Sequence, residues 1–270
     1  MESASNRQTR RWRGCPARGL ARRTCSVGWK GFIFVTALAV ALLVAAAATA
    51  TITGSDTRLA YQALANEVGK VAVDGSAYSN DGVLKGGVSR LNGVYKFHPL
   101  SRDHRYDRIY APDAPSLNPG LAPFTFSVRL KVSPDAEWSH REMAVIRHGD
   151  SDAPGGDYKM ELRKNPVTSF VSVFCVIHDD DGVGAGYVRG PGPSGSIADG
   201  RWHTIACSRV SADTVSLSVD GHTVVRTTHG DLGNVVGPVP LLIGCQFTGS
   251  GPRKREQFVG KMDDIIITVQ

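Results

Sequence analysis

A strict two-residue alternation of apolar and polar side chains is the feature that most limits how this chain can fold. Between residues 124 and 132 every second residue is apolar, and Thr, Ser, Arg and Lys fill the gaps. This period places one set of side chains on each face of a strand, so that one face is buried and the other meets water. The same alternation recurs in residues 158–163 and 214–219. The chain is therefore predicted to consist mainly of β-strands.

Other segments of strand-like character complete this prediction. They are residues 93–98, 108–111, 142–148, 170–178, 202–210, 222–227, 240–247 and 263–269. Turn dipeptides separate them, and Asp220-Gly221 between two alternating runs is the clearest hairpin signal. In residues 202–210 we expect Trp202, Ala206 and Val210 to face the core. The pattern predicts an all-β, antiparallel two-sheet sandwich of the jelly-roll type, with about five to seven strands in each sheet.

An apolar run without any charge covers residues 31–53. A helix of that length crosses a hydrocarbon core about 30 Å thick. The basic residues before it predict a cytoplasmic N-terminus and an extracytoplasmic remainder. The alternative is a cleaved signal peptide, because Ala48-Thr49-Ala50 is a small-x-small site, and the protein would then be secreted after cleavage near Ala50.

These segments divide the chain into four parts. We expect a basic cytoplasmic tail (1–30), a transmembrane signal anchor (31–53), a juxtamembrane segment with a short helix (54–66) and the sandwich (67–270). The helix is expected over residues 57–66. Membrane attachment would then be through the N-terminal helix.

The positive charge of the chain is confined to its first 30 residues. The whole chain has a formal charge of +6, whereas residues 1–30 contain eight Lys or Arg and one acid. The remaining residues are therefore close to neutral. Binding to nucleic acid needs surplus basic charge on the folded domain, so this class of partner is disfavoured.

A series of short motifs appears in a fixed order along residues 60–270. They are Val-Asp-Gly-Ser (73–76), Asn-Asp-Gly (80–82), Phe-Thr-Phe-Ser (124–127), Asp-Gly-Arg-Trp-His-Thr (199–204), Val-Asp-Gly (219–221), Leu-Ile-Gly (242–244) and Val-Gly-Lys-Met-Asp-Asp-Ile-Ile (259–266). In this order they resemble the laminin G-like, concanavalin A-like lectin/glucanase domains, particularly those of secreted or membrane-anchored bacterial proteins. The resemblance implies a jelly roll. It does not choose a function, because this fold serves lectins, adhesion modules, glycosidases and lyases.

Three cysteines, Cys175, Cys207 and Cys245, lie in the part expected outside the membrane, where disulfides persist. Three pairings are open. The resemblance favours Cys175 with Cys207, because family members often carry cysteines at these two places. The pair also stands in consecutive long segments that we expect to be neighbouring antiparallel strands. Cys245 would then be a small buried residue.

The resemblance also implies a structural calcium ion between an early loop and the last strand. The matching oxygen ligands are Asp74, Asn80 and Asp81 near the start of the domain and Asp263 or Asp264 near its end. Alternation in the last strand places Asp263 on the inward face. A cation, Lys261 or a set of backbone N–H groups would then have to satisfy its carboxylate.

Glycan sites in sandwiches combine aromatic faces with a few fixed polar groups. We expect Trp138 and Tyr187, with Arg189 as a polar neighbour, to supply a ligand site. Glycoside hydrolysis needs two carboxylates close together. Glu161 has the basic residues Lys159 and Arg163 as its neighbours on the same strand face and no second carboxylate there, so no catalytic residue is assigned. The sequence thus predicts a non-catalytic extracytoplasmic module that binds carbohydrate or another surface polymer. Protein–protein adhesion or structural support is the alternative, and a polysaccharide lyase or hydrolase comes third.

Overall fold

The computed structural model describes residues 55–63, 69–149, 154–179, 185–190, 195–228, 230–246 and 256–270. These residues belong to one compact unit, residues 50–270. The expected tail (1–30) and membrane anchor (31–53) lie outside the described residues. Among the described residues, no helix has the length and apolar character that a membrane crossing requires.

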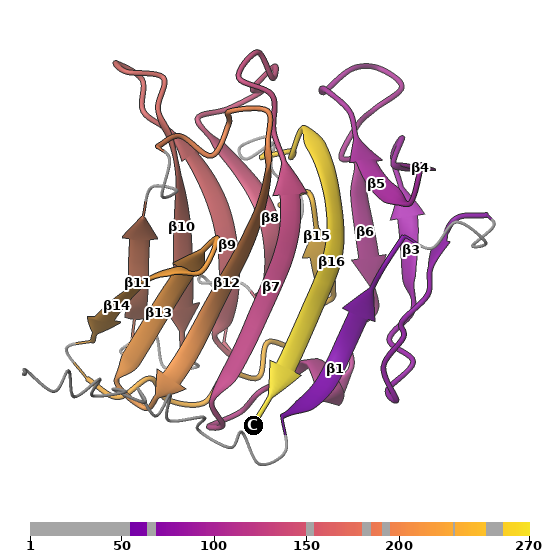
Figure 1. Cartoon of the computed structure of the whole chain (residues 1–270). Coiled ribbons are helices and arrows are strands. Elements are labelled where there is room, and N and C mark those ends of the chain that lie inside the picture. The colour runs from indigo at the N-terminus through magenta and orange to yellow at the C-terminus, as the bar shows by residue number, and fades with distance from the viewer. Residues whose placement is uncertain are drawn as a thin grey trace, which may run out of the picture. The chain divides into compact units, whose positions relative to one another are not determined.

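Two antiparallel sheets form a sandwich, and each has eight strands in the described part of the chain (Figure 1). The front sheet runs β14 (His222–Thr227), β13 (Thr214–Val219), β12 (Trp202–Ser211), β7 (Phe124–Lys131), β16 (Gly260–Val269), β5 (Val94–Phe97) and β4 (Ser89–Leu91), and β1 (Asp56–Tyr61) pairs with β16. The back sheet runs β11 (Ala185–Gly190), β10 (Val171–His178), β9 (Asp157–Lys164), β8 (Glu142–Gly149), β15 (Leu241–Ile243), β6 (Arg108–Ala111), β3 (Gly82–Lys85) and β2 (Val71–Ala72). A 3-10 turn, η1 (Pro115–Leu117), follows β6. The predicted two-sheet antiparallel fold is confirmed, with more strands than expected.

Alternate side chains of the central strands fill the space between the sheets. On β7 the apolar residues are buried and the polar residues between them are half-buried. Phe126 of the front sheet meets Tyr158 of the back sheet with ring centroids 5.0 Å apart. The two-residue period seen in the sequence is therefore the period of burial in the core.

The helix expected over residues 57–66 is wrong where the structure describes it. Residues 56–61 form β1, which pairs antiparallel with β16 and buries Leu59 and Tyr61 completely. Pairing with the exposed edge of β16 outweighs the local helical preference of a short segment. The sandwich accordingly begins at residue 56 instead of residue 67.

The inward face of β12 is also the opposite of the one expected. His203, Ile205, Cys207 and Arg209 point inward, whereas Val210 is 53% exposed. Arg209 tolerates full burial because its guanidinium donates hydrogen bonds to the carbonyls of Ala122 (3.0 Å from Nε) and Gly233 (2.8 Å from Nη1). Two polar residues on a core face therefore misled the prediction from the alternation.

We expected the two cysteines to lie on neighbouring strands of one sheet, and this is wrong. Cys175 is on β10 of the back sheet and Cys207 on β12 of the front sheet, and both are buried free thiols. They nevertheless meet across the core. Burial, with a further contribution from a hydrogen bond to Cys175, raises the pKa of the Cys207 thiol. The disulfide itself stays a prediction.

His203 joins two turns of the front sheet. Its Nδ1 lies 2.7 Å from Asp220 Oδ2 and its Nε2 lies 3.0 Å from Asp199 Oδ1. Asp220 and Gly221 both have positive φ (52° and 80°), so the expected hairpin has the conformation of a type I′ turn. Burial would lower the pKa of His203, but the two carboxylates outweigh it and the pKa lies above its usual value.

The raised pKa of His203 predicts how stability changes with pH. A group with a pKa higher in the folded than in the unfolded state stabilises fully below the unfolded value, about 6.5, and loses this effect as pH rises through the folded value. The wild type should have a higher free energy of unfolding than His203→Gln, and urea unfolding should show that this difference becomes smaller between pH 6 and pH 8. The exposed His222→Gln serves as the control. A difference that grows with pH would contradict the assignment.

Candidate functional site

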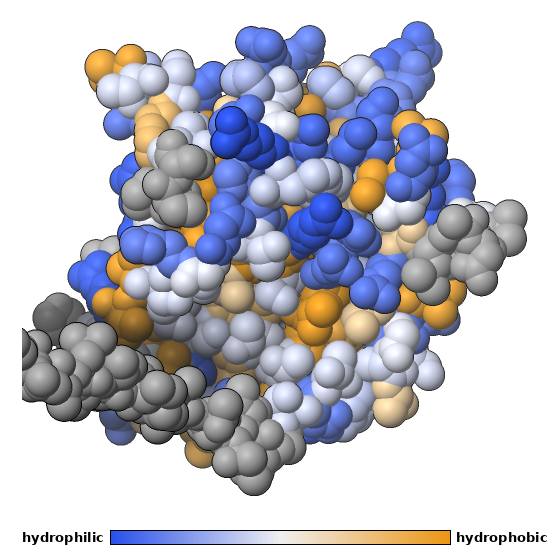
Figure 2. Space-filling model, in the orientation of Figure 1, coloured by the Kyte–Doolittle hydropathy of each residue, from blue (hydrophilic) through white to orange (hydrophobic). Residues whose placement is uncertain are grey.

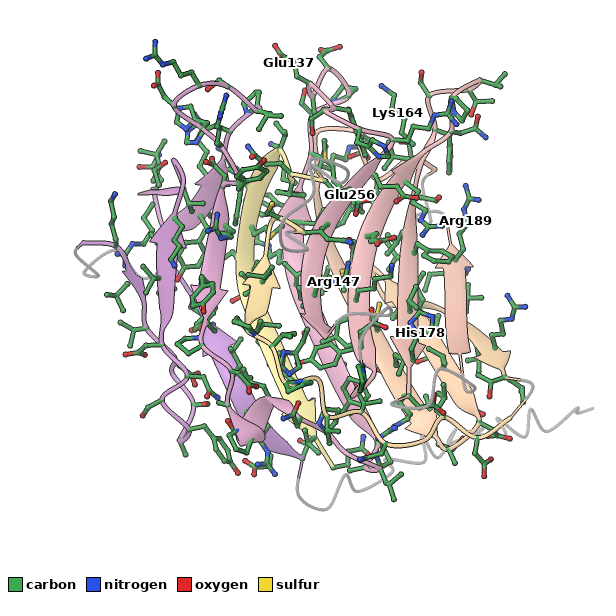
Figure 3. The ribbon with its side chains drawn as sticks, turned by 180° about the vertical axis from the view of Figure 1, so that it is seen from behind. Glu137, Arg147, Lys164, His178, Arg189 and Glu256 are labelled. Carbon is green, nitrogen blue, oxygen red and sulfur yellow. The ribbon has the colours of Figure 1, made fainter. Side chains whose placement is uncertain are left out.

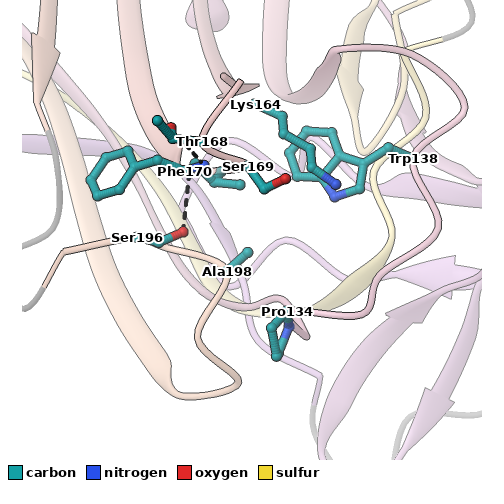
Figure 4. Close-up of a pocket in the computed structure, with 9 residues that line it drawn as sticks. Pro134, Trp138, Lys164, Thr168, Ser169, Phe170, Ser196 and Ala198 are labelled. Carbon is teal, nitrogen blue, oxygen red and sulfur yellow. Dashed lines mark hydrogen bonds between the residues drawn. The ribbon is translucent and has the colours of Figure 1, made fainter. Parts of the chain in front are cut away.

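A pocket of about 450 Å³ opens at the end of the sandwich where the β9–β10 turn meets the β7–β8 loop and the segment before β12 (Figure 4). Trp138 and Phe170 supply aromatic faces, and Thr168, Ser169 and Ser196 supply hydroxyls. Lys164, the last residue of β9, adds a positive charge at the rim. Aromatic faces beside hydroxyls and one cation are groups that recognise sugar rings and their acidic substituents.

The β9–β10 turn that forms one wall of the pocket is held by its own hydrogen bonds. Asn165 Oδ1 accepts from the backbone N–H groups of Val167 (2.9 Å) and Thr168 (3.1 Å). The Asn165 N–H donates to the Phe170 carbonyl at 2.8 Å, and Ser169 adopts a positive φ of 58°. A turn fixed in this way presents its side chains in one arrangement, so little ordering is required when a ligand binds.

The opposite wall is held by the core. Trp138 is half-buried and packs against the hydrophobic core. The Lys164 ammonium lies 5.8 Å from the centroid of the Trp138 ring, within the range of a cation–π contact. Ser196 Oγ accepts the N–H of Val171 at 3.0 Å, and this hydrogen bond connects the segment before β12 to the first residue of β10.

The outer face of the back sheet continues from the pocket along β9, β10 and β11 (Figure 3). Arg189 is exposed there, and its Nε donates to Ser172 Oγ at 2.8 Å. The Arg163 guanidinium covers the Phe174 ring at 3.6 Å from its centroid. Of the expected ligand residues, Trp138 lines the pocket and Arg189 lies on this adjoining face. Tyr187 is on β11, but its side chain lies outside what the structure describes.

Glu161 is the carboxylate at the centre of that face. It pairs with Lys159 Nζ at 3.0 Å and with Arg163 Nη2 at 2.8 Å and is almost completely buried. Burial alone would raise the pKa of Glu161, but Lys159 and Arg163 more than offset it and hold the pKa below its usual value. A glycosidase acid needs a raised pKa, so Glu161 is not suited to that role.

A cluster of one histidine and two glutamates lies near the start of β8. One ligand-type atom of each of His140, Glu142 and Glu256 lies within 4.8 Å of the other two. Glu142 also pairs with Arg163 Nε at 3.2 Å, and Glu256 is 1% exposed. No sequence pattern indicated this group, because residues 142 and 256 are far apart along the chain.

The expected calcium ligand Asp74 is a hub for hydrogen-bond donors. Its Oδ1 accepts the N–H groups of Ala60 (2.8 Å) and Ser76 (3.0 Å), and its Oδ2 accepts Asn80 N–H (2.8 Å) and Ser76 Oγ (2.7 Å). Asp81 Oδ1 accepts the N–H of Asp74 at 2.8 Å, and Asn80 Nδ2 donates to the Arg58 carbonyl at 2.7 Å. Four donors occupy the Asp74 carboxylate, which leaves it poorly suited to a cation.

Asp263 does not lie on the inward face as expected, because a bulge changes the direction of the side chains in this part of β16. A bulge in β16 lies between the ladder pairs made by Asp263 and Ile266, and Asp264 has a φ of 46°. Both carboxylates are half-exposed as a result, whereas Met262 and Ile265 point inward. Asp263 Oδ1 accepts Ala63 N–H at 3.3 Å and Asp264 Oδ1 accepts Gln62 Nε2 at 2.9 Å. Each of the two carboxylates thus has a protein donor, and the calcium ion stays a prediction.

Replacing Asp74 tests whether hydrogen bonds or a metal stabilise this corner. Asp74→Ala leaves several backbone N–H groups without an acceptor and should lower the free energy of unfolding by roughly 2–3 kcal/mol. Asp113→Ala, at an exposed position, should change it by less than about 0.5 kcal/mol. Calcium should not raise the melting temperature of the wild type. A calcium-dependent rise that Asp74→Ala abolishes would show that the ion is bound after all.

Of the residues that line the pocket, Trp138 alone was expected from the sequence, and Lys164 and Phe170 were missed together with the three hydroxyl-bearing residues. Lys164 ends an alternating strand and Phe170 precedes the next one, so each looked like an ordinary strand residue. The signal for them was the turn Asn165-Pro166 between the two strands, because residues on both sides of a tight turn lie close together in space.

Residues 103–268, more than half of the chain, match the concanavalin A-like lectin/glucanases superfamily. The chain therefore belongs to this superfamily, in agreement with the motifs and the two-sheet fold.

Solved structures share the fold at low sequence identity. The binding domain of Paraclostridial Mosquitocidal Protein 1 superposes with a TM-score of 0.58 and 15% identity over 78% of this chain and 48% of that one. The botulinum neurotoxin serotype D binding domain gives a TM-score of 0.55 and 15% identity over 78% and 47%. The serotype D ligand-binding domain in complex with N-acetylneuraminic acid gives 0.54 and 15% over the same shares. This chain spans about half the length of these structures, and no curated protein matches it in sequence.

Proposed function

We propose that the sandwich is a non-catalytic carbohydrate-binding module and that a sugar ring binds in the Trp138 pocket. The observation that carries the proposal is a single pocket of about 450 Å³ that is lined by Trp138 and Phe170, by three hydroxyl-bearing residues and by Lys164. A ring stacked on Trp138 would bury its apolar face and leave its hydroxyls to the serine and threonine side chains.

The charges around the pocket favour an acidic sugar. Lys164 stands at the rim, and Arg189 is exposed on the adjoining face of the back sheet. A ligand with a carboxylate would bind more tightly beside these cations, since charge-assisted hydrogen bonds are stronger than neutral ones. The complex of the serotype D domain with N-acetylneuraminic acid, itself an acidic sugar, supports this ligand class.

We place the module outside the cell membrane, held there by residues 31–53 or released if cleavage occurs near Ala50. The apolar run and its basic flank support this location. Surface glycans or another acidic polymer would then be within reach of the pocket.

Protein adhesion is the second candidate, and exposed valines of the front sheet favour it. Val210, Val224 and Val225 are 53%, 38% and 59% exposed, and β14 is an edge strand whose residues are all exposed. Figure 2 shows this side of the molecule, where apolar residues are scattered among polar ones over its lower half. An exposed edge strand can pair with another chain. The third candidate, a hydrolase, would depend on Glu142 and Glu256.

Binding to a glycan array tests the first proposal. The full chain should bind acidic glycans, and Trp138→Ala should weaken binding about tenfold, the loss expected for one aromatic stacking contact. Trp202→Ala is the matched control, because Trp202 is a half-buried tryptophan on the outer face of the other sheet. Lys164→Gln should weaken acidic glycans and spare neutral ones, whereas Lys85→Gln, whose ammonium also faces an aromatic ring at 4.0 Å, should have no effect.

A blank array, or equal loss in Trp138→Ala and Trp202→Ala, would contradict the sugar site and leave adhesion. Cleavage of a bound polysaccharide that Glu256→Gln abolishes would instead establish the hydrolase.

The cysteine pair tests the location. In an oxidising compartment Cys175 and Cys207 should form a disulfide, which closes a loop of about 32 residues and stabilises the domain by roughly 3–4 kcal/mol. Non-reducing peptide mapping of the exported chain should find the two joined, and Cys245→Ser should leave the map unchanged. A free Cys207 in that material would contradict the pairing.

A further inference from the structure

The loop between β5 and β6 brings together three side chains that no part of the sugar site uses. One ligand-type atom of each of His98, His104 and Asp107 lies within 4.8 Å of the other two. Asp107 Oδ2 is 3.1 Å from His98 Nδ1 and 3.8 Å from His104 Nδ1. In a tetrahedral zinc site with bonds of about 2.0–2.1 Å, neighbouring ligand atoms are about 3.3–3.4 Å apart. The two separations lie on either side of that value.

Two glycines form the floor of this cluster. Asp107 is fully buried, and its Oδ1 accepts a hydrogen bond from the N–H of Gly87. A Cβ on Gly87 would lie 1.7 Å from His104 Nδ1, and one on Gly86, whose φ is +72°, would lie 2.6 Å from Asp107 Oδ1. The imidazole and the carboxylate can occupy these positions only because both residues are glycine.

Gln257 fixes the loop from the other side. Its Nε2 donates to the carbonyls of His98 (2.6 Å) and His104 (3.2 Å), and its Oε1 accepts the N–H of Asp107 at 3.2 Å. One buried amide therefore holds the backbone of all three residues. Such outer contacts orient the ligands of metal sites.

The nitrogen of His104 that faces Asp107 is unsatisfied. His104 Nδ1 is buried and has no hydrogen-bond partner, although its ring is stacked on that of His98 with centroids 4.2 Å apart. A buried polar atom without a partner costs stability. Asp107 Oδ2 accepts the N–H of His98 at 2.8 Å and lies 3.1 Å from His98 Nδ1, so His104 Nδ1 is the one of the three ligand atoms without a partner. A divalent cation bound by all three atoms would supply that partner.

We propose that His98, His104 and Asp107 bind a divalent first-row transition metal, with Zn²⁺ as the main candidate. Two imidazoles and one carboxylate suit zinc and disfavour calcium or magnesium, which prefer oxygen ligands throughout. Three protein ligands leave a fourth position for water. The ion would secure the loop that crosses from the front to the back sheet, at the same end of the sandwich as the loop that carries Trp138 (Figure 1). The proposal is independent of sugar binding.

Zinc titration of the full chain without a polyhistidine tag tests the proposal. After removal of metal by a chelator, the wild type should bind one Zn²⁺ per chain in competition with a chromogenic chelator. Zinc, and neither calcium nor magnesium, should raise its melting temperature.

Variants locate the ion. His104→Ala should weaken zinc binding by at least the roughly 10- to 100-fold that loss of an outer contact costs. The melting temperature of the metal-free variant is measured as well, so that loss of the stacking on His98 is separated from loss of zinc. Gly87→Ala keeps every ligand but displaces the imidazole, and should also lose zinc. The exposed His222→Ala and the Glu142-associated His140→Ala are controls that should bind as the wild type does.

Failure of the wild type to bind zinc would overturn the proposal. Unchanged affinity in His104→Ala would also overturn it, and loss of binding in His140→Ala alone would place the ion at the other cluster.

Discussion

Burial of alternate side chains between two sheets is the constraint on which the rest of the structure depends. Once Phe124, Phe126, Val128 and Leu130 of β7 face the back sheet, the register sets the direction of the paired side chains on β12, and on β16 outside its bulge. The strand ends are then fixed as well. Both candidate sites are built from loops at such ends, where short turns hold side chains on a rigid support.

Polar groups inside the sandwich are stabilised by protein partners, and these explain many of the motifs. Asp74 accepts four hydrogen bonds, His203 lies between two carboxylates and Arg209 donates to backbone carbonyls. Buried polar groups that are fully paired contribute to a unique structure. The Asp-Gly and Trp-His motifs of the superfamily therefore have a structural role in this chain, and their presence alone does not indicate a ligand.

The sequence predicted the fold well because alternation and turn residues are local signals. It failed where a distant partner decides the outcome. Residues 56–61 become a strand because β16 lies beside them, and the bulge near Asp263 reverses the face on which its carboxylate lies. The inward face of β12 was misjudged because the acceptors of Arg209, Ala122 and Gly233, are remote in sequence.

In the candidate sites, too, local signals were recognised from the sequence and contacts between distant residues were not. Trp138 was recognised as an aromatic residue in a polar loop, whereas Lys164 and Phe170 became visible only when the turn brought them beside it. The cluster of His98, His104 and Asp107 depends on Gln257, which is 150 residues from Asp107 along the chain. No local pattern could have indicated that contact.

The central claim is that the Trp138 pocket holds a sugar, and a crystal structure of the chain with an acidic glycan tests it most directly. The account predicts a sugar ring stacked on the Trp138 indole, with its acidic group within hydrogen-bonding reach of Lys164 Nζ. A glycan bound instead at the exposed valines of the front sheet, or beside Glu142 and Glu256, would contradict it.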